Sequence, residues 1–377
     1  MSIPFSRPSI SDREARYLME CLEQRHLSGD GAFTKRCHAF LEAHYGATVL
    51  LTHSATAALE MGAILADIRE GDEVIMPSFT FVSTANAVVN RGGVPVFIDV
   101  DPLTLNMEPA EIDRAVTSKT KAIFPVHYAG VGCDMTEIMG RAEAHGLIVV
   151  EDAAQGYLAR RGDQALGTFG ALGCLSFHAT KNVVSGEGGA LIINDPSLRE
   201  RAHIIREKGT NRTSFLRREV TKYEWLDIGS SYLPSDLIAA LLLAQLERAE
   251  EITHTRRRLW ARYAQALRPL ETDGKLRLTR VPQDAEHNGH IFFVMMPTPE
   301  KARALRAELA QHEIGATSHY VPLHSAPAGR RFGRTVGDLA QTDLAAATLV
   351  RLPLYSDLDD ATQDIVIAKT VAAVQAA

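Results

Sequence analysis

Short apolar runs alternate with helix-like segments between about residues 47 and 194, and this alternation constrains the fold more than any other feature of the sequence. The runs are rich in β-branched residues and occupy residues 48–52, 73–77, 95–100, 122–127, 147–152, 174–178 and 190–194. Continuously apolar strands separated by helices predict a mostly parallel sheet covered on both faces. Such a sheet binds its ligand beyond the carboxyl ends of its strands.

The last two runs depart from this pattern. The segment that joins them, 179–189, is too short to contain a crossover helix and is rich in glycine. Parallel neighbours need a connection of a dozen or more residues, whereas antiparallel neighbours do not. We therefore predict an antiparallel pair at this point.

The character of the sequence changes after about residue 235. Residues 235–267 predict one long or kinked amphipathic helix. Beyond it we expect strands at 290–296 and 316–324 and helices at 301–313 and from 359 onward. The predicted fold class is α/β, with a large domain (1–245) built on a mostly parallel central sheet and a smaller C-terminal α+β domain (246–377). The polar and aromatic stretch 209–232 has no clear period and predicts an ordered loop.

Charge and composition exclude several classes of protein. The net charge is −6, no basic cluster stands apart from acidic neighbours, and no apolar run approaches the ~20 residues that span a bilayer. We therefore expect neither a nucleic-acid partner nor a membrane partner. The start of the sequence lacks a secretory pattern, and its four cysteines have no metal-site spacing, so we expect a cytoplasmic protein without a metal.

A lysine and an acid follow two of the predicted strands. Lys181 lies in SFHATKNVVSGEGGA, just past a strand end and before a glycine-rich turn. A lone loop lysine is usually a solvated charge, but this one is flanked by apolar strands. Asp152 ends the apolar strand of LIVVEDAAQ, where an unpaired carboxylate would be costly. It either caps a following helix or pairs with a cationic ligand, and Gln155 stands three residues beyond it.

Two further segments complete the pattern. THSATAALEMG opens a helix directly after a strand, and the free N–H groups there favour an anion. Thr56 and Ala57 lie in this segment, and Ser176 could add a hydroxyl. Phe81 follows another strand and is either a core aromatic or a flat surface for a ring. A lysine amine, an acid, a phosphate cup and a stacking aromatic are together typical of a site for pyridoxal 5'-phosphate (PLP).

At these residues the sequence resembles the DegT/DnrJ/EryC1/StrS family of sugar aminotransferases. Motifs in the family style cover nearly the whole chain: GDGAFT (29–34), THSATAALEM (52–61), DEVIMPSFTFVSTANA (72–87), PVHYAGV (125–131), VVEDAAQ (149–155), LGTFGALGCLSFHATKN (166–182), GEGGALI (186–192), YLPSDLIAALLLAQL (232–246) and HYVPLHSAP (319–327). Within the family, LLTHSATAALEM, VHYAGV and IIREKGTNR look most like the TDP-4-amino-4,6-dideoxygalactose transaminases of enterobacterial-antigen sugar synthesis. The resemblance implies the aspartate-aminotransferase fold, known as fold type I.

The resemblance also implies roles for the candidate residues. Lys181 would form a Schiff base with PLP and move protons, and Asp152 would hold the pyridinium nitrogen. Gln155 would contact the ring oxygen, and Phe81 would take the stacking place held by tryptophan or tyrosine in many relatives. The phosphate would be held by Thr56, Ala57 and Ser176.

The implied reaction moves an amino group from L-glutamate to C4 of TDP-4-keto-6-deoxy-D-glucose. Family members are homodimers with shared active sites, so the apolar stretch 237–246 and the loop 209–232 are expected near a subunit interface. Many relatives carry asparagine or arginine in the loop that reaches the partner's phosphate, but this sequence reads SSYL, so Ser230 or Ser231 is the candidate. The candidates for the substrate side are Gly29, Asp30, His319, Tyr320 and His324.

Three alternatives stay open. The product could carry the equatorial (gluco) amine, or the substrate could be another nucleotide keto sugar. A dehydratase of this fold would replace the lysine with histidine, which Lys181 argues against. A non-catalytic PLP-binding regulator would usually carry an added DNA-binding domain, and the family motifs already occupy most of the chain.

Overall fold

The computed structural model describes residues 2–376. Within them, eight strands form one sheet in the order β1-β9-β8-β5-β4-β2-β3-β13. Their bounds are β1 Thr48–Thr52, β9 Gly189–Ile193, β8 Leu172–Ser176, β5 Ile148–Asp152, β4 Thr120–Ile123, β2 Glu73–Pro77, β3 Val94–Ile98 and β13 Arg334–Thr335. The strands from β8 to β13 run parallel, and β9 is antiparallel to both of its neighbours. The predicted α/β class with a mostly parallel sheet is confirmed, and so is the antiparallel pair.

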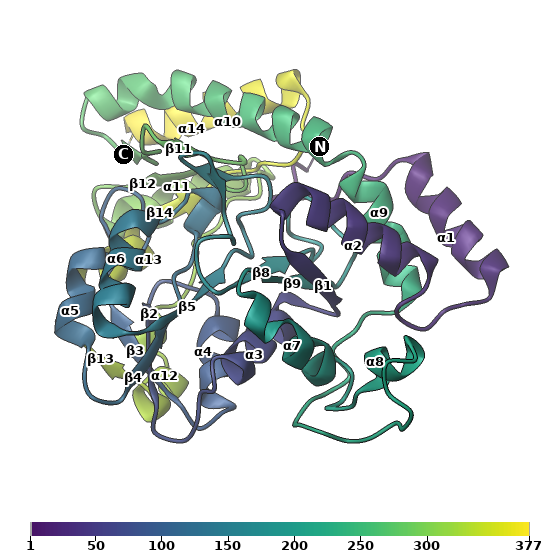
Figure 1. The fold of residues 1–377 in the computed structure, drawn as a ribbon. Helices are drawn as coiled ribbons and strands as arrows, with labels where there is room; N and C mark the ends of the chain where they lie inside the picture. Colours follow the sequence, from purple (N-terminus) through teal and green to yellow (C-terminus); the bar gives the residue numbers. More distant parts are fainter. Residues whose placement is uncertain (1, 377) are drawn as a thin grey trace.

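Helices cover both faces of this sheet (Figure 1). Those of the first part of the chain are α1 Asp12–Gln24, α2 Ala32–Tyr45, α3 Ala55–Leu65, α4 Val82–Val89, α5 Ile112–Ala115, α6 Met135–His145, α7 Arg199–Arg206, α8 Arg212–Leu216 and α9 Asp236–Leu246. The buried apolar faces of α3 and α4 share one core cluster with β2 and β8. On the other side, α2 and α9 pack with β1 and β9. The sheet is therefore buried on both faces, which explains its continuously apolar strands.

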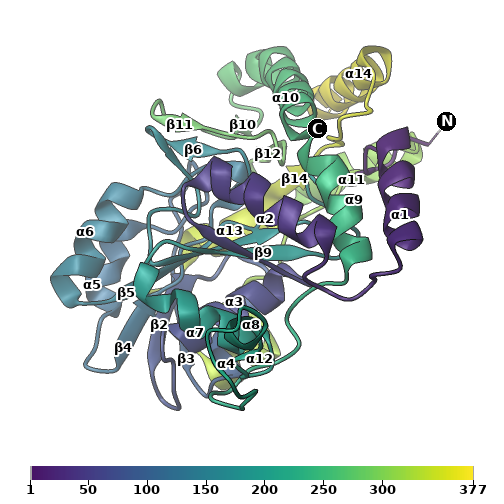
Figure 2. The same cartoon turned by 45° about the vertical axis from the view of Figure 1, so that its right-hand side comes forward.

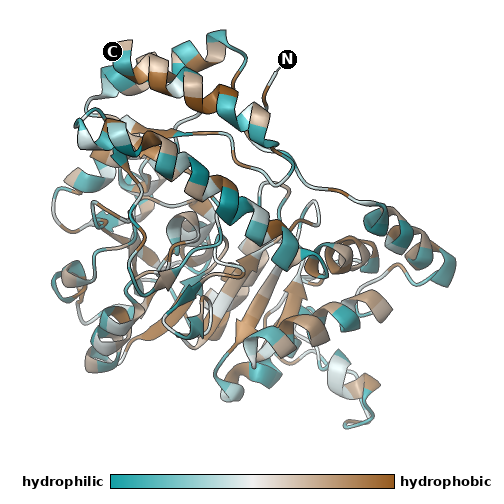
Figure 3. Cartoon of the chain, turned by 90° about the horizontal axis from the view of Figure 1, so that it is seen from above, coloured by the Kyte–Doolittle hydropathy of each residue, from teal (hydrophilic) through white to brown (hydrophobic). Residues whose placement is uncertain are grey.

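The C-terminal part forms a second core around a small sheet of β10 Arg277–Leu278, β12 Phe293–Met295 and β14 Leu349–Arg351. Its long helices are α10 Ala249–Thr272, α11 Pro299–Gln311 and α14 Asp360–Ala376, and the shorter ones are α12 Pro327–Phe332 and α13 Ala340–Thr348. Helices α10 and α14 lie side by side over this core (Figure 2). Figure 3 shows the hydrophobic strands enclosed by helices whose outer turns are hydrophilic.

Two chain segments cross between the cores. Ile3 packs with the residues of α10 and α11, far from its neighbours in sequence. In the other direction, β13 joins the large sheet beside β3, and Leu323 and Leu339 pack into the core of that sheet. The division of the chain into domains 1–245 and 246–377 therefore stays a prediction. Its boundary lies close to the point where α9 ends and α10 begins.

Two details differ from the sequence-based expectations. The predicted long helix is two helices, α9 and α10, that break at Glu247 and Arg248. Residues 316–324 form no strand, because Tyr320 has a left-handed φ of 34° and Pro322 has no N–H for a ladder; one bridge, Thr317 to Arg351, is all that forms. Most of the apolar stretch 237–246 is buried against α1 and α2 of the same chain, and only Leu237, Ile238 and Leu241 stay partly exposed, so its place near a subunit interface stays a prediction.

No helix in residues 2–376 is both long enough and apolar enough to cross a bilayer.

Candidate functional site

Four strands bring chemically distinct residues to one edge of the large sheet. Asp152 and Ser176 end the parallel strands β5 and β8, and Thr52 ends β1. Because β9 is antiparallel, its first residue, Gly189, lies at the same edge and pairs with both Thr52 and Ser176. A side chain on Gly189 would lie 2.5 Å from the backbone nitrogen of Ala55, so only glycine lets α3 begin this close to the sheet.

A cavity of about 640 Å³ opens at this edge, between the large sheet and the C-terminal core. The predicted site residues that line it are Thr56, Phe81, Asp152, Gln155, Ser176, Lys181, His319 and Tyr320. Residues from 56 to 320 in the sequence therefore meet in one hollow.

Lys181 is positioned by the turn between β8 and β9. Its backbone N–H donates to the carbonyl of His178 at 2.8 Å. The next residue, Asn182, is buried; it donates to the carbonyl of Asn288 at 2.9 Å and its Oδ1 lies 2.9 Å from Nδ1 of His290. Burial lowers the pKa of Lys181, Asp152 partly opposes this shift and Arg351 adds to it, and the resulting pKa is about 8. Far more of this amine is therefore neutral near physiological pH than of an ordinary lysine, although the protonated form still predominates.

Asp152 is almost fully buried, and both of its carboxylate oxygens have partners. Thr84 Oγ1 donates to Oδ2 at 2.7 Å, and the backbone N–H of Ala154 donates to Oδ1 at 3.1 Å. No helix follows Asp152, so it does not act as the helix N-cap that was the alternative interpretation. The carboxylate is fixed in orientation and lines the cavity.

Gln155 is held at both ends of its side-chain amide. Its Oε1 accepts the N–H of Ala129 at 2.8 Å, and its Nε2 donates to the hydroxyl of Tyr320 at 3.0 Å. This links the large-sheet edge to the loop of the C-terminal core that carries Tyr320.

The N-terminus of α3, where the sequence predicted an anion site, has N–H groups that lack an acceptor. Ser54 is the N-cap, and its Oγ accepts the N–H of Ala57 at 3.1 Å. The N–H groups of Ala55 and Thr56 have no acceptor among residues 2–376, and both residues line the cavity. Ala57 was predicted to contact the cofactor. It follows Thr56 in the helix, but its side chain is buried and does not line the cavity.

Hydroxyl groups surround this helix end. Ser176 comes from β8. Ser83, which the sequence did not single out, lies 2.7 Å from Thr56 Oγ1 through its own Oγ. A local signal was present in FVST, where Ser83 is a serine in the first turn of a helix that begins just after Phe81.

Phe81 lies at the N-cap of α4, and its side chain is 58% exposed within the single chain. An exposed large aromatic at the wall of a cavity has a free face. It is therefore not the ordinary core aromatic of the alternative interpretation.

His319 and Tyr320 stack on each other, with ring centroids 3.6 Å apart. The hydroxyl of Tyr128 lies 2.8 Å from Nδ1 of His319. Burial lowers the pKa of His319 to about 2, so its imidazole is neutral. The left-handed backbone of Tyr320 is sterically strained for a residue with a side chain, and strain of this kind often marks a functional loop.

The other predicted residues lie away from the cavity of their own chain. Gly29 packs against Leu233, and Asp30 forms an ion pair with the buried Arg206 at 2.9 Å. His324 is tied to Ser78 by its Nδ1 at 2.8 Å, and its Nε2 faces Asp343.

Ser230 and Ser231 are exposed, and backbone contacts hold them to the end of α7. The single chain therefore does not bring them, or Gly29, Asp30 and His324, to the cavity.

Among the cavity residues that the sequence did not single out are Phe5, His290 and Arg351. They come from the N-terminal segment, from a loop before β12 and from the end of β14. Nothing local distinguishes these residues, because their proximity depends on how the second core docks against the sheet. RLPL at 351–354 has no pattern beyond an apolar strand end.

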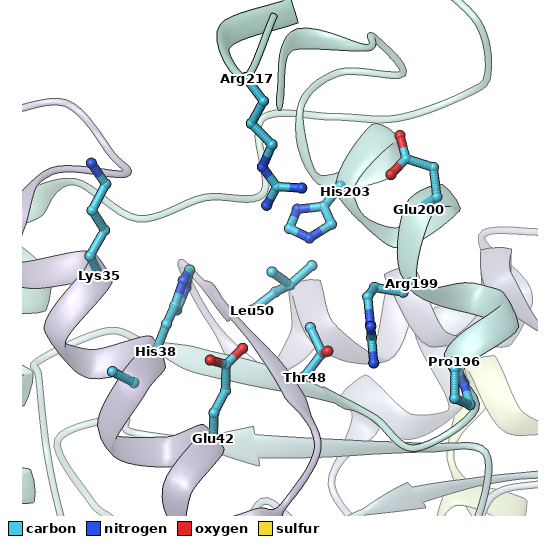
Figure 4. A pocket seen from close by; sticks show the side chains of 11 residues that line it. Lys35, His38, Glu42, Thr48, Leu50, Pro196, Arg199, Glu200, His203 and Arg217 are labelled. Atoms are coloured by element: carbon cyan, nitrogen blue, oxygen red, sulfur yellow. The ribbon is translucent and has the colours of Figure 1, made fainter. Parts of the chain in front are cut away.

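A second hollow, of about 570 Å³, lies between α2, β1 and α7 (Figure 4). Lys35, Arg199 and Arg217 are exposed around it, and Glu42 and His203 are half-buried there. It contains no residue from the carboxyl ends of β5 or β8, whereas the first cavity combines those ends with a helix N-terminus. We therefore assign the chemistry to the first cavity.

The residues of the first cavity fit PLP. The unpaired N–H groups of α3 and the nearby hydroxyls suit a phosphate, and the free face of Phe81 suits an aromatic ring. Lys181 offers a partly neutral amine, and Asp152 offers a fixed carboxylate for a protonated ring nitrogen. Each group that PLP presents has a matching group in the protein.

Comparisons with known proteins agree with this fit. The model of the DegT/DnrJ/EryC1/StrS aminotransferase family matches residues 8–371. The chain is 33% identical to the spore coat polysaccharide biosynthesis protein SpsC of Bacillus subtilis (strain 168), covering 97% of this chain and 95% of the relative. It is 30% identical to GDP-perosamine synthase of Escherichia coli O157:H7, and the match covers 86% of this chain and 86% of the relative. The aminotransferase TlmJ from Streptoalloteichus hindustanus has a similar structure, with 30% identity, a TM-score of 0.92 and full coverage of both chains.

Proposed function

This chain belongs to the DegT/DnrJ/EryC1/StrS aminotransferase family, and from that premise we propose that it transfers the amino group of L-glutamate to C4 of TDP-4-keto-6-deoxy-D-glucose. It is a PLP-dependent sugar aminotransferase of fold type I. The proposed product is TDP-4-amino-4,6-dideoxy-D-galactose. The observation that carries the proposal is the joint presence of Lys181, Asp152 and the open N-terminus of α3 in one cavity.

PLP, when bound, supplies an electron sink for the bond that breaks at the substrate carbon and carries the amino group between the two half-reactions. Asp152 would hold the ring nitrogen protonated, since its carboxylate is fixed by Thr84 and Ala154. Gln155 would face the ring oxygen, with its amide oriented by Ala129 and Tyr320. The end of α3 and Ser176 would hold the phosphate, and Phe81 would cover the ring.

Lys181 is both the attachment residue and the proton carrier in this proposal. Its lowered pKa lets the amine accept a proton from a substrate carbon and return it at neighbouring positions. Lys181, His319 and Tyr320 are half-buried around the cavity, which limits the access of water to the reacting atoms.

The nucleotide sugar enters from the side of the C-terminal core in this proposal. His319 and Tyr320 line the cavity there. The neutral imidazole of His319 can donate a hydrogen bond to a sugar hydroxyl or accept one from it. Tyr320 also fixes Gln155, so its substitution should affect the cofactor as well as the sugar. The relative named GDP-perosamine synthase supports a nucleotide sugar as substrate but does not favour TDP over GDP.

A homodimer completes the site in this proposal. The segment 215–228 projects from the body of the chain (Figure 1) and exposes several large apolar side chains: Phe215, Leu216, Val220, Tyr223, Trp225, Leu226 and Ile228. Exposed apolar surface of this kind is typical of an interface. Ser230 and Ser231 follow it directly and would reach the partner's phosphate. The four cysteines are buried free thiols, which supports a cytoplasmic setting.

The test is product analysis. The protein is incubated with PLP, L-glutamate and TDP-4-keto-6-deoxy-D-glucose, with the GDP-linked 4-keto-6-deoxy sugar in a parallel reaction and Lys181→Ala as the control. The proposal predicts an amino sugar whose proton coupling constants at C4 show an axial amine. An equatorial amine or a preference for the GDP sugar would correct the substrate. Failure of every keto sugar to accept an amine would contradict the function and favour the regulator.

A further inference from the structure

Arg351 is a charged group of the cavity whose guanidinium has no acceptor within the described residues. It ends β14, and its backbone is bonded on both sides to Thr317. Its guanidinium makes no hydrogen bond and no ion pair with any residue from 2 to 376, and its Nε is buried without an acceptor. It is held only by the ring of Phe5, whose centroid lies 4.4 Å from Cζ. Arg351 is half-buried, and an arginine at a cavity wall whose inner N–H has no acceptor is unusual in a folded protein.

The carboxylates near the cavity cannot neutralise this charge. Asp152 already accepts from Thr84 and Ala154, and Glu187 is exposed, with its carboxylate toward His178. The neighbouring hydroxyl groups of Tyr128 and Tyr320 are also uncharged, because burial raises the pKa of each. The free protein thus carries an unpaired cation in a hollow of about 640 Å³.

The surrounding groups add positive charge and do not offset it. Arg256 lies behind the wall and donates to the carbonyls of Gly289 and His290. Burial, with a smaller contribution from Arg351, lowers the pKa of Arg256 to about 9, so the two guanidinium groups lie near enough to repel each other. Burial together with Lys181, Arg256 and Arg351 keeps the pKa of His290 well below its usual value. The site is built for an anion beyond the cofactor phosphate, which α3 accommodates elsewhere in the cavity.

We propose that Arg351 binds the α-carboxylate of the amino-acid donor through its planar fork, with Phe5 holding the plane of the guanidinium. This inference rests on the proposed aminotransferase function and identifies how the donor half of the reaction is recognised. Arginine pairs with carboxylates by two parallel hydrogen bonds, which fix orientation as well as adding affinity. A donor oriented in this way presents its amino group and Cα hydrogen toward Lys181.

The position of Arg351 favours a donor carboxylate over the pyrophosphate of a nucleotide sugar. The α-carboxylate of an amino acid is bonded to the carbon that reacts, so its partner must lie near Lys181. The pyrophosphate of a nucleotide sugar is attached at C1, across the sugar ring from C4. Arg351 shares the cavity with Lys181 and is close enough to contribute to its lowered pKa. The cation therefore lies beside the reacting centre, where the sugar substrate has no anionic group.

The first experiment measures binding without turnover. Glutarate, a dicarboxylate without an amino group, is titrated into the PLP-loaded enzyme by calorimetry. Loss of a charge-assisted pair is expected to weaken binding by about 10- to 100-fold in Arg351→Gln. Arg351→Lys keeps the positive charge without the planar guanidinium, so its affinity for glutarate should lie between those of wild type and Arg351→Gln. Arg258→Gln is the matched control, because Arg258 is an exposed arginine of α10 paired with Asp360.

The second experiment separates the half-reactions by stopped-flow spectroscopy. Wild type should react with L-glutamate far faster than with isoglutamine, whose α-carboxylate is a neutral amide. Arg351→Gln should lose most of this discrimination while its amine-loaded form still reacts normally with the keto sugar. If Arg351→Gln instead binds glutarate as wild type does, or slows both half-reactions equally, the assignment is wrong. A wild-type enzyme that binds glutarate through Arg351 but aminates no keto sugar would refute the proposed function alone.

Discussion

At the scale of single residues, the site depends on burial as much as on residue type. Lys181 is one of several lysines in the sequence, and it becomes reactive because burial and Arg351 lower its pKa while Asp152 only partly compensates. Asp152 keeps a fixed carboxylate at the same wall because Thr84 and Ala154 hold its two oxygens. Both properties come from neighbours that are distant in sequence.

We expect the apoprotein to take up PLP covalently with a pH midpoint near 8. The neutral amine is the reacting form, and a pKa of about 8 means that its fraction rises as the pH rises through 8 and not through the ordinary lysine value near 10.4. The rate is followed by absorbance between pH 6.5 and 10, with Lys181→Ala as the inactive control. Arg351→Gln should move the midpoint upward, because it removes a cation that disfavours the protonated lysine. A midpoint at or above 10 would show that Lys181 is not desolvated.

Asp152→Asn should leave the fold intact and reduce turnover on the order of 100-fold or more, as loss of a fixed charge in an active site commonly does. Asparagine can still accept the hydrogen bond from Thr84, but it cannot hold a ring nitrogen in its protonated form. Turnover and circular dichroism are measured on the same preparation. An unfolded variant would mean that the carboxylate serves mainly to hold its own turn together.

At the scale of elements, a buried pair connects the strand that carries Asp152 to two loops. Glu151 on β5 accepts the backbone N–H groups of Gly167, Phe169 and Gly170. It also pairs with Nε2 of His127 at 2.8 Å, while Nδ1 of His127 accepts the N–H of Cys133. The proton of a neutral His127 is therefore on Nε2, and one carboxylate holds three chain segments beneath the cavity.

Glu151→Gln should destabilise the protein by about 3 kcal/mol, because the new NH₂ group faces N–H donors that are fully buried. Thermal unfolding followed by circular dichroism checks this, with Glu143→Gln on the exposed side of α6 as the control. A melting temperature equal to that of wild type would show that the loops are held by other contacts.

At the scale of the whole molecule, the exposed apolar segment 215–228 is the feature that a single chain leaves unexplained. Trp225 is 80% exposed, and Leu226 beside it is 56% exposed. Burial of such side chains against a second copy would remove this surface from water, at roughly 25 cal/mol for each Å² of apolar area.

Light scattering should give twice the mass of one chain at assay concentration. The double variant Trp225→Ser, Leu226→Ser should shift this toward the monomer and weaken PLP retention, since the partner's loop would no longer reach the phosphate. Leu344→Ser, which removes an exposed leucine on α13, is the control. A fully active monomer would contradict the shared active site.

The sequence by itself determined the sheet, its antiparallel pair and the residues that follow its strand ends. Periodicity decides these features, because a strand buried on both faces must be apolar along its length and its polar ligands must come where it stops. Lys181, Asp152, Gln155, Ser176, Phe81 and Thr56 were found in this way, and all of them line the cavity.

Only the tertiary structure decided the wall opposite the sheet. Phe5, His290 and Arg351 come from three separate segments, and the charge of Arg351 acquires meaning only because no carboxylate within residues 2–376 pairs with it. In the same way, His324 lies away from the cavity, because its contacts with Ser78 and Asp343 turn it aside. Local pattern reports which face of an element is buried, but which buried faces meet depends on how the two cores pack.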